Sequence, residues 1–365
     1  MLFRSKVSDL AVFSGLERTD VEQAEAGEIV AVAGLEQVSI GDTIADAEQP
    51  VALPRVTIDE PTVQMTFSVN NSPFAGREGK FLTSRHLRER LFKELETNVS
   101  LRVQETDSAD RFLVAGRGEL HLGVLIEQMR REGYELQVSQ PEVILHRDGG
   151  KVTEPYEELT IQVPETYQGT VIEEIGKRRG EMRHMKLVHS DAGPSEIHLE
   201  YHIPTRGIMG LKNILLAKTR GTVIMHHVFK AYETANEQDL LIAPHGSLCA
   251  FEDGTSTAYA LFMTQERGEL FLGPGVEVYR GMVVGENSRD EDLDVNVCKE
   301  KHLTNMRASG SDEALVLTPP REMTLEFALE YIGSDELVEV TPKSLRLRKR
   351  LLHPEDRRKA RKAGK

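Results

Sequence analysis

The sequence predicts a multidomain α+β protein, and three observations lead to this prediction. Residues 112–138 follow the order strand, glycine turn, helix and strand in one unbroken pattern. Residues 153–233 repeat an order of strands and helices, and the C-terminal part is rich in glycine and in short alternating strands. A chain of 365 residues, 39% of them hydrophobic, is long enough for two or three domains with buried cores.

Each element of the first segment has its own signal. Residues 112–115 form a short apolar run, and Gly116 and Gly118 bracket the turn that follows. Glu119 stands where the positive end of a helix favours a carboxylate. Gly133 is a C-terminal stop, so a helix is predicted between Glu119 and Gly133. Its apolar face carries Leu122, Leu125, Ile126 and Met129.

The second segment alternates in the same way over about eighty residues. Its pattern predicts a strand, a helix, two strands, a helix and a strand, at residues 157–163, 167–177, 182–189, 197–203, 207–218 and 222–230. The first segment extends back to a strand at residues 63–69 and to a helix bearing Leu87, Leu91 and Leu95. Both segments are therefore predicted to be split βαββαβ domains of the ferredoxin-like kind.

Changes of composition divide the chain into five parts. They are residues 1–52, 53–60, 61–147, 153–233 and 234–365. The first has strands and turns, but too few strands to close a barrel, and the second is an extended linker with Pro54. The last is predicted to be mostly β, with one helix at residues 324–332 and a basic tail.

Four runs of sequence resemble a known family. GELHL, at residues 118–122, resembles a turn in the third domain of translational GTPases of the elongation factor G type. YQGTVIEEIGKRRGEM, at residues 167–182, resembles the helix and turn of their last ferredoxin-like domain. Residues 258–289 and 301–320 resemble the C-terminal domain of the ribosome-associated BipA/TypA GTPases. The chain is identified as the C-terminal part of a member of the BipA/TypA family.

This resemblance implies an architecture and a set of partners. Residues 1–52 would be the end of the β-barrel domain II, residues 61–147 and 153–233 the ferredoxin-like domains III and V, and residues 234–365 the BipA-specific C-terminal domain. The implied function is ribosome and RNA binding, in translation or in ribosome assembly under stress. The implied partners are the ribosome, the large-subunit rRNA and the A-site tRNA, with neither a membrane nor DNA among them.

GTP chemistry is expected to belong to a domain that the family has and this chain lacks. No GxxxxGK[ST] phosphate loop occurs in the sequence. The nearest run is GREGK at residues 76–80, but its glycines are too close together and Phe81 replaces the hydroxyl that binds magnesium. We therefore expect no catalytic residue and no cofactor in this chain. GTP and Mg²⁺ would bind only the missing GTPase domain of the parent protein.

The net charge of −14 is distributed unevenly. From Lys343 onward there are eleven Lys or Arg residues and two acids, so the last 23 residues carry +9 and the preceding 342 carry −23. Such a basic end on an acidic body is typical of a protein that presents selected faces to RNA. Leu345 and Leu347 alternate with cations and predict a strand with one basic side suited to an RNA backbone. The cations of this segment are Arg346, Arg348, Lys349 and Arg350. Residues 357–365 are explained equally well as a solvated tail.

Two further groups of residues are candidates for RNA contact. The loop of residues 286–312 contains Arg289, Lys299, Lys301, His302, Asn305, Arg307 and Ser309. Its cations can neutralise phosphates, and its amide and hydroxyl groups can bond the sugar 2′-hydroxyls of RNA. In the family the equivalent loop reaches toward the acceptor end of A-site tRNA; a purely structural loop is the alternative. The other group, expected at large-subunit rRNA, is Lys177, Arg178, Arg179 and Arg206.

Two other classes of function remain as alternatives. His198, Glu200 and His202 project from one side of a predicted strand and could bind a metal in a hydrolase, although a solvated strand face explains them better. A protein-only interaction scaffold is the second alternative. Cys249 and Cys298 have no metal-binding spacing, and the sequence has neither a signal-peptide pattern nor an apolar run near ~18 residues. A cytoplasmic protein is expected.

Overall fold

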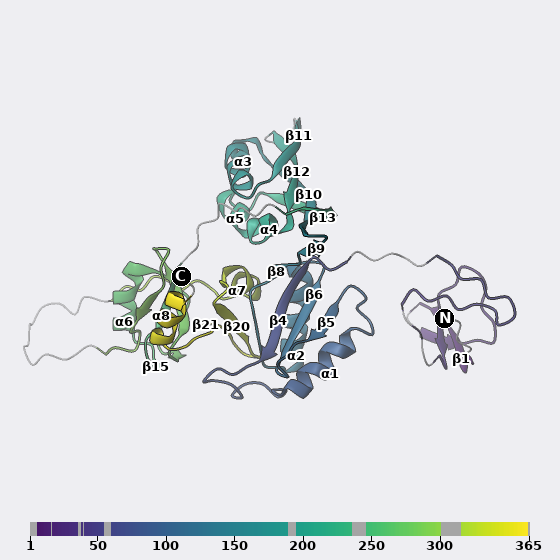
Figure 1. Ribbon diagram of the computed structural model, residues 1–365, viewed down its shortest axis with the longest axis horizontal. Helices are drawn as coiled ribbons and strands as arrows, with labels where there is room; N and C mark the ends of the chain where they lie inside the picture. The colour runs from purple at the N-terminus through teal and green to yellow at the C-terminus, as the bar shows by residue number, and fades with distance from the viewer. Residues whose placement is uncertain are drawn as a thin grey trace, which may run out of the picture. The chain divides into compact units, whose positions relative to one another are not determined.

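The computed structural model describes residues 6–15, 17–35, 38, 40–54, 60–188, 195–235, 246–300 and 315–363 (Figure 1). The chain forms two compact units. One comprises Met1–Asp59 and Lys93–Val99, and the other Glu60–Phe92 and Ser100–Lys365.

The N-terminal unit contains an open antiparallel sheet. Its strands are β1 (Asp9–Ser14), β2 (Glu17–Asp20) and β3 (Val30–Ala33), in the order β2-β1-β3. Ala11 of the central strand is fully buried. Three strands in an open sheet agree with the partial barrel that the sequence predicts.

The first ferredoxin-like domain has the predicted βαββαβ order. Its elements are β4 (Val63–Val69), α1 (Ser84–Glu94), β5 (Arg102–Glu105), β6 (Arg111–Gly116), α2 (Glu119–Glu132) and β7 (Leu136–Val138), and the short β8 (Glu142–Val143) pairs with β4. The strand order is β7-β4-β6-β5. Gly133 ends α2 with a φ of 98°, and its N–H bonds to the carbonyl groups of Met129 and Arg130. The predicted boundaries of α2 are thus confirmed.

The second ferredoxin-like domain has the same topology, with the strand order β11-β12-β10-β13. Its elements are β10 (Lys151–Pro164), the 3₁₀ turn η1 (Glu165–Tyr167), α3 (Gln168–Lys177), β11 (Glu181–Val188), β12 (Glu196–Pro204), α4 (Thr205–Ile208), α5 (Leu211–Lys218) and β13 (Ile224–Thr234). The strand β9 (His146–Asp148) pairs with the start of β10. Leu159 and Leu199 on the strands are buried with Ile175 of α3 and Leu215 of α5, which gives the domain its own core.

One helix of this domain differs from its prediction. The sequence predicts a continuous helix at residues 207–218, but the structure has two helices, α4 and α5, separated at Met209 and Gly210. Gly210 has a φ of 68°, in the left-handed region that glycine adopts without strain. This glycine interrupts the helix even though the apolar spacing continues through it.

The C-terminal domain is mostly β, as predicted. Its strands are β14 (Gly246–Ala250), β15 (Gly254–Thr255), β16 (Gly268–Leu270), β17 (Glu277–Val278), β18 (Met282–Asn287), β19 (Leu293–Val295), β20 (Glu336–Val340) and β21 (Leu345–Lys349). The predicted helix at residues 324–332 is present as α7 (Leu325–Tyr331), capped by the hydroxyl of Thr324. Two further helices were not predicted, namely α6 (Ala258–Thr264) and α8 (Pro354–Ala363).

A single sheet joins the C-terminal domain to the first ferredoxin-like domain. Strand β20 pairs antiparallel with β7, with Val338 opposite Val138, so the strand order runs β19-β14-β18-β21-β20-β7-β4-β6-β5 (Figure 1). Strand β21 lies between β18 and β20 and is therefore an interior strand. This position decides the environment of its basic residues.

Candidate functional site

Arg346 of β21 is largely enclosed by the protein. It forms ion pairs with Glu78, in the loop that follows β4, and with Glu339 of β20 at 3.3 Å. Glu339 is fully buried and also accepts hydrogen bonds from Asn70, Ser72 and Tyr279, at 2.7–2.9 Å. Burial alone would raise the pKa of Glu78, but hydrogen bonds from Thr341 and Arg346 outweigh it and lower that pKa.

The next two cations of β21 are also buried. Arg348 is 3% exposed and donates hydrogen bonds to the side-chain oxygens of Asn71 and Gln137. Burial lowers the pKa of its guanidinium. Lys349 is 3% exposed; burial opposes its charge, but nearby carboxylates outweigh burial and raise its pKa. Those carboxylates are Asp292 at 2.8 Å, Glu336 at 3.0 Å and Asp335 at 3.1 Å.

The predicted basic strand face is therefore not exposed as expected. Arg346 and Arg348 face the loop of residues 71–80, and Lys349 faces Asp292, Asp335 and Glu336. Arg346 and Arg348 connect the C-terminal domain to the first ferredoxin-like domain, whereas Lys349 is paired with carboxylates of the C-terminal domain itself. Arg350, just beyond the strand, is exposed.

The cations at the helix ends of the second ferredoxin-like domain fall into two groups. Arg178 is 3% exposed and donates to the carbonyl oxygens of Gly207 at 3.0 Å and Met209 at 2.8 Å, so the prediction that it meets RNA does not fit its position. Arg206 pairs at 2.7 Å with Glu154, which is almost fully buried. Lys177 is more accessible, although it contacts glutamates one turn earlier, and Arg179 is partly exposed.

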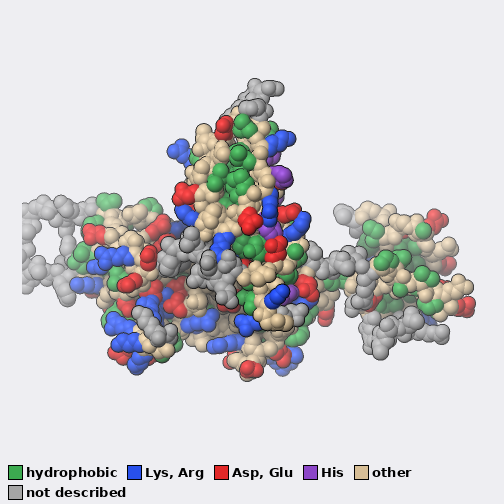
Figure 2. Space-filling model, turned by 45° about the horizontal axis from the view of Figure 1, so that its top comes forward, with side chains coloured by type: hydrophobic (Ala, Val, Ile, Leu, Met, Phe, Trp, Pro, Cys, Tyr) green, Lys and Arg blue, Asp and Glu red, His purple; other side chains and the backbone are tan. Residues whose placement is uncertain are grey.

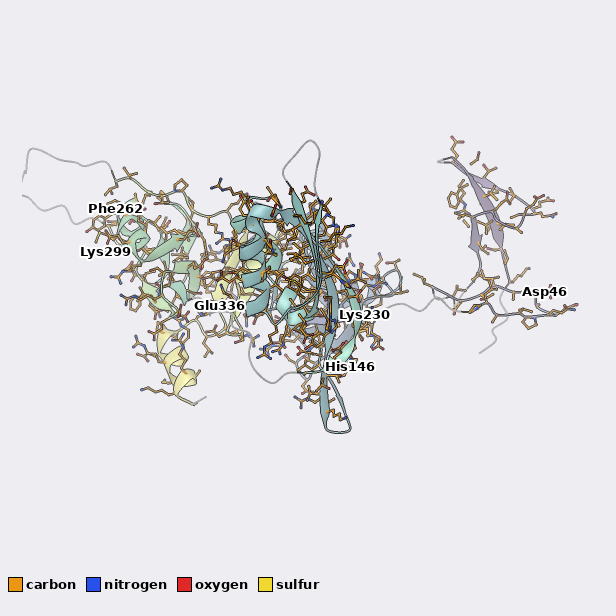
Figure 3. The ribbon with its side chains drawn as sticks, turned by 90° about the horizontal axis from the view of Figure 1, so that it is seen from above. Asp46, His146, Lys230, Phe262, Lys299 and Glu336 are labelled. Carbon is orange, nitrogen blue, oxygen red and sulfur yellow. The ribbon has the colours of Figure 1, made fainter. Side chains whose placement is uncertain are left out.

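The predicted loop is described only at its start. Arg289 and Lys299 are exposed, and the carbonyl oxygen of Lys299 accepts a 2.6 Å hydrogen bond from Thr257, the N-cap of α6. Figure 3 labels Lys299 and Phe262 of α6 in the C-terminal domain. The other candidates lie outside the described residues; they are Lys301, His302, Asn305, Arg307 and Ser309.

The two runs that suggested metal or phosphate chemistry have other partners. His202 contacts Glu233 at 2.9 Å and stacks on Tyr156, and no group of three potential metal ligands occurs among the described residues. In the GREGK run, the N–H groups of Gly76 and Gly79 donate to the carboxylate of Glu135, at 2.8 Å and 3.0 Å. These backbone donors therefore serve a side chain of the same domain.

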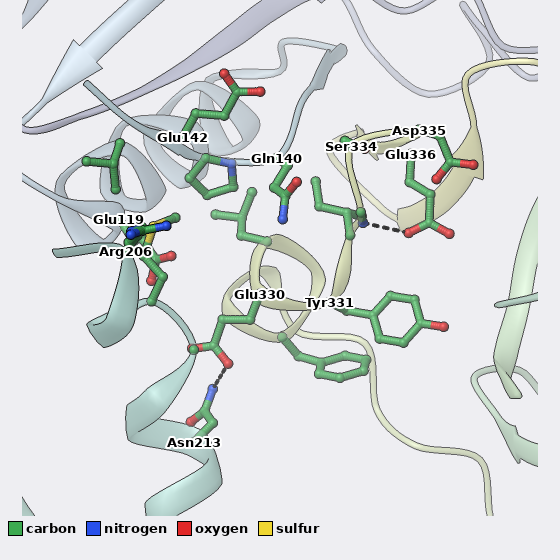
Figure 4. A pocket seen from close by; sticks show the side chains of 18 of the residues that line it. Glu119, Gln140, Glu142, Arg206, Asn213, Glu330, Tyr331, Ser334, Asp335 and Glu336 are labelled. Carbon is green, nitrogen blue, oxygen red and sulfur yellow. Dashed lines mark hydrogen bonds between the residues drawn. The ribbon is translucent and has the colours of Figure 1, made fainter. Parts of the chain in front are cut away.

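A cavity of about 1260 Å³, lined by both apolar and charged side chains, lies where the two ferredoxin-like domains and α7 meet (Figure 4). Glu330 of α7 accepts a 2.6 Å hydrogen bond from Asn213 of α5. Glu119, at the start of α2, lines the same cavity; burial and then the Glu330 carboxylate raise the pKa of Glu119 to about 7. The sequence suggested Glu119 only as a helix-start residue and gave no signal for this pairing of acids.

On the face seen in Figure 2, Lys and Arg lie next to Asp and Glu over the ferredoxin-like domains and the C-terminal domain. A polyanion would therefore meet exposed cations only in small groups, and not over a wide basic surface, on this face of the molecule. In the parts of the chain that the structure describes, no helix is long and apolar enough to cross a membrane.

Residues 151–241 match the family model of the elongation factor G C-terminus. Together with the tandem βαββαβ domains, this match defines the class of protein, the translational GTPases of the elongation factor G type. The family model of the TypA/BipA C-terminal domain matches residues 245–354. The chain belongs to the TypA/BipA family and corresponds to a C-terminal part of its members, as the sequence runs predicted.

Individual relatives support this assignment along nearly the whole chain. The large ribosomal subunit assembly factor BipA of Synechocystis is 52% identical over 95% of this chain and 57% of its own length. The protein of the same name from Escherichia coli K12 is 50% identical over 99% of this chain and 59% of its own length. The putative chloroplastic elongation factor TypA-like SVR3 of Arabidopsis thaliana is 49% identical over 94% of this chain and 50% of its own length. The chain thus spans between half and three fifths of these relatives.

Proposed function

We propose that this chain is a ribosome-binding part of a TypA/BipA-type translational GTPase and that it binds through RNA in the cytoplasm. The observation that supports this most directly is 50% identity over 99% of the chain to a protein named a large ribosomal subunit assembly factor. Large-subunit rRNA and the acceptor end of A-site tRNA are the partners we propose, with a role in translation or ribosome assembly under stress. GTP hydrolysis would belong to the GTPase domain of the parent protein.

The positions of the cations limit which residues can carry this function. Arg178, Arg348 and Lys349 are buried, and Arg346 is paired with Glu78 and Glu339, so these four cations serve the fold. The accessible candidates within the described residues are Lys177, Arg179, Arg289, Lys299 and Arg350. Because lysine and arginine act on RNA mainly by neutralising phosphate, binding at these positions should be sensitive to salt.

Co-sedimentation with large ribosomal subunits at several salt concentrations tests the proposal. We expect the chain to bind, and we expect binding to be lost after ribonuclease treatment. Replacing Arg289, Lys299 and Arg350 by alanine should reduce the slope of log affinity against log salt by about two, since each phosphate contact contributes roughly 0.7–0.9. Binding that survives ribonuclease would favour a protein-only scaffold instead.

A matched control changes net charge equally at another place. Arg85, Arg102 and Arg131 have side chains that are 85%, 60% and 77% exposed, and all lie in the first ferredoxin-like domain. Replacing these three by alanine should alter the salt slope much less. An equal reduction in both triple variants would mean that overall charge, and not the proposed positions, governs binding.

A further inference from the structure

The C-terminal helix α8 is fixed to the body of the protein by two arginines. Arg357 is 7% exposed and donates to the carbonyl oxygens of Leu351 at 3.1 Å and Leu352 at 2.8 Å. Arg357 also pairs with Asp294 of β19, and Arg361, one turn later, pairs with Asp292. One side of the helix is therefore held in place, which a freely solvated tail would not be.

The opposite side of α8 carries a second set of cations. A helix advances by roughly 100° per residue, so Arg358, Lys362 and Lys359 lie roughly 100°, 140° and 200° around the axis from Arg357. All three are exposed. Glu355 of the first turn lies roughly 160° from Arg357, on the same side as these cations. Asp356 lies 3.7 Å from Lys359, and both side chains of that pair are mostly in solvent. Such an exposed pair is weak.

The cations at the basic end of the chain fall into two groups, those bound within the protein and those exposed on α8. Among the described residues of this basic end, five cations form close contacts with other groups of the protein, namely Arg346, Arg348, Lys349, Arg357 and Arg361, and Lys359 has only the exposed pair with Asp356. Arg358, Lys359 and Lys362 are exposed on a helix that Arg357 and Arg361 attach to the rest of the domain. Because their backbone is already ordered, binding a ligand would not require ordering the helix again.

The composition of the outer side of α8 indicates the class of ligand. Arginine and lysine without neighbouring asparagine, glutamine or aromatic side chains suit phosphate oxygens and give little base recognition. A helix that lies on a membrane would carry large apolar residues beside its cations, whereas α8 has only Ala360 and Ala363 between its charged residues. A nucleic-acid backbone fits this surface better than a lipid surface does.

We propose that Arg358, Lys359 and Lys362 of α8 form a phosphate-binding row that contacts the RNA backbone. This inference rests on the proposed function, since it assumes that the chain binds ribosomal RNA, and it adds a surface of residues beyond those predicted from the sequence. Arg357 and Arg361 act as positioning residues, because their ion pairs with Asp294 and Asp292 fix the orientation of the helix that carries the row.

The test uses the full chain and a triple variant, Arg358→Ala, Lys359→Ala and Lys362→Ala, since alanine preserves the helix. We expect the slope of log affinity against log salt for large ribosomal subunits to fall by about two. The melting temperature should stay close to that of the unchanged chain. The control variant without Arg85, Arg102 and Arg131 should keep nearly the original slope.

The outcomes separate this inference from the proposed function. If the unchanged chain binds subunits in a ribonuclease-sensitive way and the α8 variant keeps the same slope, the phosphate-binding row is wrong and the proposed function stands. If the unchanged chain does not bind, the proposed function fails as well. Equal losses in the α8 variant and the control would also overturn the inference, because net charge would then explain both.

Discussion

Arg346 of β21 and Glu78 of the loop after β4 form an ion pair between residues that are 268 positions apart in the sequence. The pair lies beside the junction at which β20 adds to β7 and continues the sheet of the first ferredoxin-like domain. Glu339, fully buried, joins the same group through Arg346. Backbone pairing and a buried polar network therefore connect these two domains at the same place.

Replacing Arg346 by alanine should destabilise this junction. The change would leave Glu339 buried without its cation, and breaking a buried ion pair on one side typically costs about 3 kcal/mol or more. Denaturant unfolding should show a lower midpoint. Arg350→Ala, at an exposed position four residues later, should stay within about 0.5 kcal/mol. Equal effects of the two changes would contradict the structural role of Arg346.

A second stability prediction concerns Arg178. Its guanidinium donates to the carbonyl oxygens of Gly207 and Met209, and thereby ties the end of α3 to the segment around α4. Arg178→Ala should cost about 2–3 kcal/mol, because hydrogen bonds to a buried charged group are stronger than neutral ones. Thermal unfolding of this variant and of Arg183→Ala, which removes an exposed cation, measures the difference. A stable Arg178→Ala variant would mean that these bonds do not hold the domain.

The repeated domains were predictable because their signals are local. The apolar spacing of α2 and the glycine at its end lie within fifteen residues, and each predicts part of the same helix. The break at Gly210 was missed because apolar spacing does not reveal a left-handed residue. The pairing of β20 with β7 could not be predicted either, because the side-chain pattern of a strand does not show which distant strand its backbone bonds to.

The candidate site was predicted less well, for a related reason. Alternation of Leu345 and Leu347 with arginines predicts a strand with one basic side, and the strand is present. Whether that side meets water depends on what covers it. Here the cover is a loop of residues 71–80 from another domain, which brings Glu78 to Arg346. A sequence pattern shows which side chains share a face of a strand, but it does not show which other residues cover that face.

The chain alone should neither bind nor hydrolyse GTP. The GREGK run lacks the spacing and the hydroxyl of a phosphate loop, and the N–H groups of Gly76 and Gly79 are already bonded to Glu135. Calorimetric titration with GTP and magnesium should give no saturable heat. Micromolar binding would overturn this domain assignment.

Glu119 should make stability depend on pH near neutrality. Its pKa is about 7 in the folded chain against a usual 4.5, so its contribution to stability is complete below pH 4.5 and is lost as the pH rises through 7. Glu119→Gln should therefore stabilise the chain at pH 8 by roughly 1–2 kcal/mol, allowing for a lost helix-dipole interaction. Unfolding at pH 5 and pH 8 measures this. Glu142→Gln, at an exposed position on the same cavity, should have little effect at either pH.

His227 should make the stability of the second ferredoxin-like domain depend on pH. Its Nδ1 lies 2.5 Å from the carboxylate of Glu157, which is 5% exposed. This hydrogen bond raises the pKa of His227 above 6.5; burial and Lys212 oppose the shift, and Glu119 adds to it. Because the folded pKa is raised, the stabilisation is complete below pH 6.5 and disappears as the pH rises through the folded value.

Replacing His227 by glutamine tests this relationship. The free energy of unfolding lost in His227→Gln should be largest at about pH 5.5 and should shrink steadily toward pH 9, because the charged form alone gains from the Glu157 carboxylate. The matched change His226→Gln alters the neighbouring exposed histidine and leaves the pair with Glu157 intact. A stability loss in His227→Gln that is constant across this range would show that the contact does not depend on the charge of the imidazole.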